Sequence, residues 1–251
     1  CQCVEQIAPT SVATLCATAI FLMQQCLQEK DELNRQAAID KFNAVCASFD
    51  HIIKDRQSNA FLMLRYGMLR LMFTEPFENL DKKMKAAVNS GRVLTPIEEG
   101  NFSIYAKVID LLVTVIQNCS TVIMELRRSN LLQITRSLIA SDAVPATFAA
   151  SLLTLYESLV YGDSQHSEQH VMVIINLLST MKGKYDKLKC ILVCICKTYY
   201  NKADVVEMWE RVDGFSILID LLSVEKLKED LLNSNDRSRG DEAYEFISSK
   251  L

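Results

Sequence analysis

The feature of this sequence that most constrains its fold is an internal similarity that recurs at intervals of 40 and 44 residues. Three apolar segments align with one another: LLQITRSLIAS from Leu131, VMVIINLLSTM from Val171 and FSILIDLLSVE from Phe215. Their apolar positions follow the i, i+3, i+7 spacing that places side chains on one face of an α-helix. A unit of this length cannot bury its apolar face alone, so the sequence predicts a stack of helices.

A second set of segments aligns in the same way and predicts another long helix in each unit. These segments are VIDLLVTVIQN from Val108, LLTLYESLVYG from Leu152 and LVCICKTYYNK from Leu192. Short helices are predicted before two of the units, at Ser120–Arg128 and Asp204–Val212. Two long helices and one short helix per unit therefore describe the predicted repeat.

The composition favours an all-α fold. The 251 residues include only 7 Gly and 4 Pro, so few positions favour turns. Thr95-Pro96-Ile97-Glu98 predicts a helix start, with Thr95 as N-cap, Pro96 in the first turn and Glu98 closing a capping box. Pro76 is expected to end a helix over Ser58–Phe73, which is apolar nearly all round and is therefore expected to be buried on most sides. The apolar run Val12–Met23 has no basic residues before it and is too short to cross a bilayer, so a buried helix is expected.

Two turns carry a resemblance to a known family. Ser129-Asn130-Leu131-Leu132 and Val212-Asp213-Gly214-Phe215 each lead into a Leu-rich helix, and each resembles the turn before the second helix of an armadillo repeat. Gly214 matches the Gly of that turn, and Asn130 also tolerates a positive φ angle. The resemblance to the armadillo (HEAT-like) superfamily implies a right-handed α-solenoid. It predicts irregular helical hairpins or a cap over residues 1–94 and armadillo-like repeats over 95–251, in one continuous solenoid domain.

The resemblance also implies a function, because such proteins bind other proteins on a concave groove lined by one helix per repeat. Where peptide-binding members carry an Asn that clamps an extended peptide, this chain has Thr114, Ser158 and Thr198. A helix or a folded domain therefore fits the groove at least as well as an extended peptide. The other predicted groove residues are Tyr156, Tyr161, Lys197, Tyr200 and Asn201. Tyr supplies both apolar area and a hydroxyl at interfaces, although each Tyr can instead pack between helices.

The sequence offers little for catalysis, and we expect no enzyme activity, cofactor or metal. It has three His, and His166 and His170 lack a nearby third ligand. Cys190, Cys194 and Cys196 lie in an apolar run, where burial is the better interpretation, and Trp209 is expected in the core. No phosphate-binding glycine motif occurs.

The expected partner is a protein, with no small-molecule substrate and no membrane insertion, and a homo-oligomer is compatible with the pattern. Nine cysteines at irregular spacing favour a reducing compartment, the cytoplasm or the nucleus. The main alternative is a helical repeat that associates with nucleic acid through the basic clusters Arg127-Arg128, Lys82–Lys85 and Lys182–Lys189. A net charge of −4 argues against it. An enzyme on a helical scaffold is the third hypothesis.

Overall fold

A computed structural model describes residues 9–55, 57–160, 167–180 and 184–199, with single residues between 207 and 220. Within this part of the chain every element is a helix and none is a strand, so the prediction of an all-α fold is confirmed. The first six elements are α1 (Pro9–Gln28), α2 (Glu32–Asp55), α3 (Gln57–Arg65), the π-helix η1 (Leu69–Thr74), α4 (Glu75–Ser90) and α5 (Pro96–Asn118). They are followed by α6 (Ser120–Arg128), α7 (Leu131–Ala140), α8 (Ala146–Val160), α9 (Ser167–Thr180) and α10 (Tyr185–Tyr199).

The chain divides into two compact units, residues 1–159 and 160–251. The expected change from an N-terminal cap to repeats at residues 94–95 stays a prediction. Helices α2 and α5, which come from either side of that position, pack against each other within the first unit.

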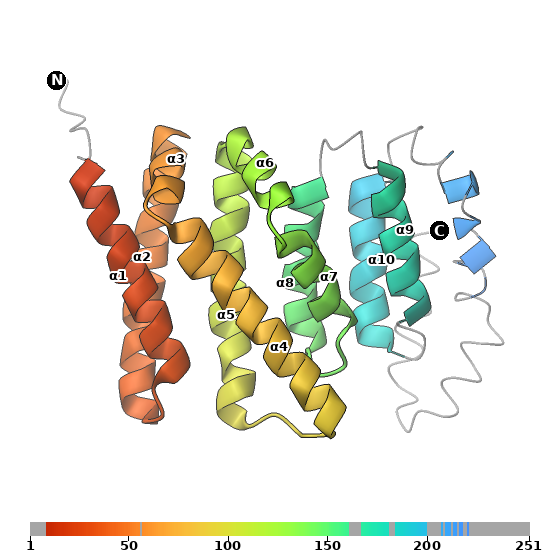
Figure 1. Cartoon of the computed structure of the whole chain (residues 1–251), viewed down its shortest axis with the longest axis horizontal. Helices are drawn as coiled ribbons and strands as arrows, with labels where there is room; N and C mark the ends of the chain where they lie inside the picture. The colour runs from red at the N-terminus through yellow and green to blue at the C-terminus, as the bar shows by residue number, and fades with distance from the viewer. Residues whose placement is uncertain are drawn as a thin grey trace. The chain divides into compact units, whose positions relative to one another are not determined.

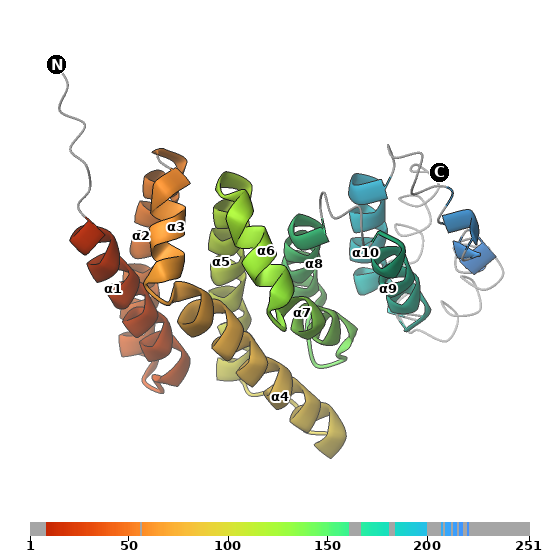
Figure 2. The same cartoon turned by 45° about the horizontal axis from the view of Figure 1, so that its top comes forward.

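The first unit has two layers of helices (Figures 1 and 2). Helices α2, α5 and α8 lie side by side in one layer, and α1, α3, α4, α6 and α7 cover one face of it. Helix α2 contacts α5 within the first layer. Contacts between α1 and α2 and between α5 and α6 join the two layers. Each pair of neighbours buries apolar side chains that a single helix would leave in water.

Four aromatic side chains join α4, α5 and α8. The ring of Phe77 meets that of Tyr105 edge-on at a centroid distance of 5.3 Å, and Phe102 lies 5.0 Å from Phe148. Tyr105 and Phe148 are 6.3 Å apart and complete the cluster. All four are buried, and such ring pairs add to the free energy gained from burial alone.

The segment from α3 to α4 corrects one sequence prediction. The helix expected over Ser58–Phe73 is interrupted at Gly67, where φ is +79°, a left-handed value that glycine adopts without strain. After Gly67 the chain re-enters a helix as η1, in which the Glu75 amide donates to the Arg70 carbonyl five residues earlier. Pro76 falls where this pattern changes to that of α4. Its missing amide hydrogen costs little in the first turn, so Pro76 lies at a helix start and does not end a helix.

Helix α1 is longer than the apolar run that predicted it. The window Ser11–Gln28 has a mean hydropathy of 1.2. By length and composition it could cross a membrane, but core helices of soluble proteins also reach this length and hydropathy. In the structure a third of this window is buried. The buried side chains Val12, Cys16, Ala19, Met23 and Cys26 form one stripe. The expected burial is therefore confirmed for one face of α1 alone.

The start of α5 follows the sequence prediction closely. The Glu98 amide donates to Thr95 Oγ1 at 3.3 Å, the Thr95 amide donates to Glu98 Oε2 at 2.9 Å, and Pro96 lies in the first turn. Arg92 adds two hydrogen bonds to the Glu98 carboxylate, at 2.8 and 3.0 Å. These bonds fix the loop between α4 and α5.

In the second unit α9 packs against α10, and Trp209 is buried at 3% exposure, as predicted. Gly214 lies against it: a Cβ atom at Gly214 would come within 2.5 Å of Trp209 Cε3 and 3.0 Å of Ile175 Cδ1. The positive φ in this turn, +55°, belongs to Asp213. Gly214 is thus required for space, and not for the backbone angle that the resemblance suggested.

Candidate partner-binding surface

Two of the predicted groove residues, Thr114 on α5 and Ser158 on α8, have the same environment. Both are partly exposed, and both hydroxyls donate to the carbonyl four residues earlier, Asp110 at 3.0 Å and Thr154 at 2.9 Å. Helices α5 and α8 belong to the same layer (Figure 1), and each contributes one of these partly exposed residues to it. A hydroxyl bonded to its own helix can still accept a hydrogen bond from a partner.

Tyr156 is a correction. Its side chain is fully buried, and the guanidinium carbon of Arg136 on α7 lies 5.9 Å from the centre of its ring. A residue without exposed surface cannot contact a partner, so Tyr156 is a core residue that fastens α8 to α7. Its aligned position on α5 is Leu112, which is also fully buried.

The remaining predicted groove residues fall at the edge of what the structure describes. Tyr161, Tyr200 and Asn201 lie outside the described residues, as do the side chains of Lys197 and Thr198, whose backbones belong to α10. Their roles in a groove stay predictions.

The order of buried and exposed positions supports two of the predicted alignments. Residues 108–116 and 152–160 share the order of two buried, one exposed, two buried, two intermediate and two buried positions. In the other set, Leu131, Ile134 and Leu138 on α7 correspond to Val171, Ile174 and Leu178 on α9, and all six are buried. Segments at the same place in the alignment therefore bury the same face.

The predicted alignment of α10 with α8 is wrong, because aligned positions differ in burial. Leu192 and Val193, aligned with buried residues of α8, are partly exposed, whereas Cys194, aligned with exposed Thr154, is buried. A shift of five residues restores most of the order and places Val193 where α8 has Ser158. In an apolar run such as KCILVCIC, several registers fit the spacing of apolar residues equally well.

The chemistry of the described residues is sparse. No group of three His, Cys, Asp or Glu side chains in this part of the chain is placed to hold a metal. Burial raises the pKa of Cys16 and of Cys46 from 9.0 to about 12, and it also raises the pKa of Cys26 and Cys190. Thiols with raised pKa values are poor nucleophiles at neutral pH. His170 is buried, and His166 lies outside the described residues.

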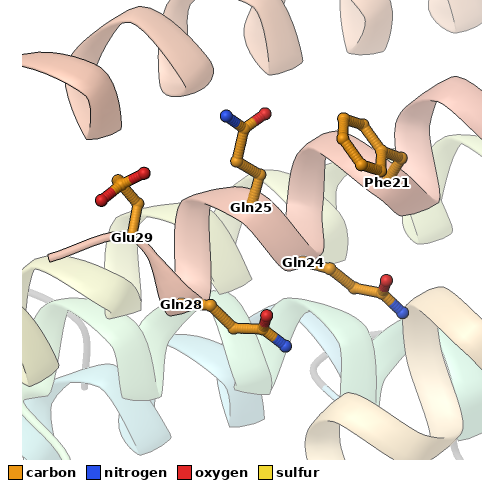
Figure 3. Close-up of a pocket in the computed structure, with 5 residues that line it drawn as sticks. All are labelled: Phe21, Gln24, Gln25, Gln28 and Glu29. Atoms are coloured by element: carbon orange, nitrogen blue, oxygen red, sulfur yellow. The ribbon is translucent and has the colours of Figure 1, made fainter.

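An open hollow of about 330 Å³ lies along α1 (Figure 3). Its lining comes from one helix and the residue after it: Phe21, Gln24, Gln25, Gln28 and Glu29. The Glu29 carboxylate accepts hydrogen bonds from the amides of Lys30 and Asp31, at 2.9 and 3.0 Å, and so serves the turn into α2. Among the described residues the lining comes from α1 and Glu29 alone, whereas small-molecule pockets are enclosed by several elements.

The basic clusters are partly engaged within the chain. Lys85 Nζ pairs with Asp81 at 2.6 Å, and Arg127 Nε donates to the Leu159 carbonyl at 2.7 Å near the end of α8. Lys187 is buried. These three cations therefore contribute to the structure of the chain, and less positive charge is left for a nucleic acid than the sequence clusters suggest.

A surface that the sequence analysis missed lies on α1, α3 and α6. Phe21, Phe61 and Met124 are exposed by 63%, 54% and 52%, one on each helix. Contacts join α1 to α3 and α3 to α6, so the three helices are neighbours. The segment around α3 is apolar nearly all round, which predicted burial on most sides. The helical spacing could have predicted this exposure, because Phe21, Phe61 and Met124 do not share a helix face with the buried residues of their own helices.

The chain was compared with protein-family models, curated proteins and solved structures. No family model matches the chain, and neither a curated protein nor a solved structure matches it.

Proposed function

We propose that the chain is an armadillo-like α-solenoid whose function is to bind another protein, without catalysis of its own. The observation that carries this proposal is the shared order of burial in residues 108–116 and 152–160. Helices that bury the same face at each step of a repeat present the same opposite face at each step. Such an array provides an extended surface, and a partner protein is the ligand that extended surfaces suit.

The layer formed by α2, α5 and α8 supports this function by its composition. Beyond the first turn of each helix, its exposed described side chains are small, polar or charged; they include Ala44, Ser48, Lys107, Asp110 and Thr154. A surface of this kind accepts a close approach of another backbone, with hydroxyls available for hydrogen bonds. The free cysteines among the described residues fit a reducing compartment, the cytoplasm or nucleus.

The test is affinity capture from a cell lysate, carried out with and without nuclease and at increasing salt. We expect specific proteins to be retained after nuclease treatment. Binding through phosphate contacts weakens steeply with salt, so retention that nuclease or moderate salt abolishes would favour the nucleic-acid alternative. A control bait of similar size and charge identifies proteins that adhere to any acidic helical domain. Failure to retain any protein beyond that control would contradict the proposal.

A further inference from the structure

We propose that the outer face of α1, α3 and α6 binds an acidic amphipathic helix of a protein partner. This outer face is defined by Phe21, Phe61, Arg65, Met124 and Arg128. The inference rests on the proposed function, because it assigns to such a protein-binding chain a second surface, besides the layer of α2, α5 and α8, and gives the chemistry of the partner for it.

The apolar residues of this face point away from the core. With 100° per residue, Phe21 lies opposite the stripe of α1 that Cys16, Ala19 and Met23 bury. Met124 likewise lies opposite Val122 and Leu126 of α6. On α3, Phe61 lies on the side away from Asn59 and Met63. Since these helices belong to the layer that covers α2 and α5, their exposed sides face outward (Figure 2).

The two layers of the first unit differ in what they expose. On α2 and α5 the large exposed apolar residues, Leu33 and Ile97, lie in the first helical turn, and α8 has none among its described side chains. The covering layer exposes Phe21, Phe61 and Met124 in mid-helix. Single exposed apolar residues are common, but three on neighbouring helices of one layer form the kind of patch that marks a protein interface.

The charges of the outer face select an acidic partner. Helix α1 has no charged residue. Arg65 and Arg128 each follow an exposed apolar anchor by four residues, which places them on the same side of the helix as Phe61 and Met124. Both arginines are exposed, and within the described part of the chain neither forms an ion pair with a carboxylate. Glu125 is the one exposed acid on α6, so the face keeps a positive balance on a chain with net charge −4.

A helix that lies across α1, α3 and α6 would meet one anchor on each of these neighbouring helices. Packed helices are about 8–10 Å apart, and a helix rises about 1.5 Å per residue. Apolar side chains about seven residues apart on the partner match this distance between neighbouring helices, and a segment of about 15 residues carries three of them. Glu or Asp side chains beside its second and third apolar residues would reach Arg65 and Arg128, where carboxylates can bind the guanidinium groups in pairs.

The test uses two fluorescent 16-residue peptides with Leu at positions 1, 8 and 15 and helix-forming residues between. They differ only in carrying Glu or Lys at the flanking polar positions. Fluorescence anisotropy should show the Glu peptide binding the chain at least tenfold more tightly than the Lys peptide. The double variant Phe61→Ser and Met124→Ser should lose at least tenfold in affinity, and Arg65→Glu with Arg128→Glu should reverse the preference. Val88→Ser on α4 replaces an exposed apolar residue outside the outer face, so it is the matched control and should bind as the unaltered chain does.

Equal binding of both peptides, no binding, or binding unchanged by these variants would overturn the inference, as would preferential binding to phosphatidylserine vesicles. Melting temperatures of the variants should stay within a few degrees, since the altered side chains are more than half exposed or lie at helix ends. Lysate capture separates the two proposals. If the unaltered chain and the Phe61→Ser, Met124→Ser variant retain the same proteins, the outer face is excluded and the proposed function stands. If the unaltered chain retains none, the proposed function fails.

Discussion

The hydroxyl of Ser137 on α7 donates a hydrogen bond of 2.6 Å to Oδ1 of Asp81 on α4. Asp81 is only 9% exposed, and its other oxygen accepts from Lys85 Nζ, also at 2.6 Å. A carboxylate in this position needs donors, because burial of an unsatisfied charge is costly. This hydrogen bond joins α4 and α7, two helices of the covering layer, through residues that are 56 positions apart in the sequence.

Ser137→Ala should lower the free energy of unfolding of the first unit by about 1–3 kcal/mol, because it leaves one oxygen of a buried carboxylate without its donor. Urea unfolding followed by circular dichroism measures the change. The matched control is Ser158→Ala, whose hydroxyl bonds only to the carbonyl of Thr154 on its own helix. Equal effects of the two substitutions would show that the Asp81 contact contributes nothing.

Glu98 should make stability depend on pH at the acid end. The hydrogen bond from Arg92, and next that from the Thr95 amide, lower the pKa of Glu98 from 4.5 to about 2. A carboxyl with a depressed pKa in the folded state stabilises the fold fully above its unfolded pKa and loses that contribution as pH falls toward 2. The melting temperature of Glu98→Gln should therefore decline less between pH 5 and pH 2 than that of the unaltered chain. Parallel curves for the two proteins would refute this role.

Sequence reasoning located the helix boundaries best where local chemistry decides them. The capping box at Thr95 and Glu98 satisfies backbone amides within four residues of sequence, and α5 starts there. Helix α6 likewise has the predicted bounds, Ser120–Arg128. The sequence did not predict the interruption at Gly67, because apolar residues continue on both sides of it. Pro76 is harmless in a first turn, and only the tertiary structure shows which glycine takes a positive φ.

The candidate surface was less predictable than the fold. Periodicity tells which residues share a helix face, but it does not tell which of two apolar faces is covered. Tyr156 and Phe61 show both kinds of error: the first was expected at a surface and is buried, and the second was expected in a buried helix and is 54% exposed. The neighbours that decide these outcomes come from helices distant in sequence.

Tyr156→Ala should destabilise the first unit by about 3–5 kcal/mol, the range for loss of a large buried aromatic side chain. Tyr156→Phe keeps the ring beneath Arg136 and should cost far less. Chemical unfolding of the two variants measures the difference. A groove residue would behave otherwise: both substitutions would leave stability unchanged, and Tyr156→Ala would weaken partner capture by a chain that is still folded.

The last prediction concerns Gly214 in the second unit. A methyl group there would stand 2.5 Å from Trp209 Cε3, closer than a Cβ atom approaches another atom in folded proteins, and 3.0 Å from Ile175 Cδ1, which is also a tight contact. Gly214→Ala should therefore displace the indole and cost about 1–3 kcal/mol, as other overpacked cores do. Because Trp209 is the only tryptophan, its fluorescence reports the displacement directly, as a red shift when the ring gains water.

Gly91→Ala is the matched control for that measurement. Gly91 has a φ of +61°, but no atom lies within 4 Å of the position its Cβ would occupy. Its substitution strains the backbone at the end of α4 and leaves Trp209 untouched, so stability should fall without a change in emission. If Gly214→Ala also left the emission of Trp209 unchanged, the close contact between Gly214 and the indole would be disproved. The turn before Phe215 would then need glycine for some reason other than space.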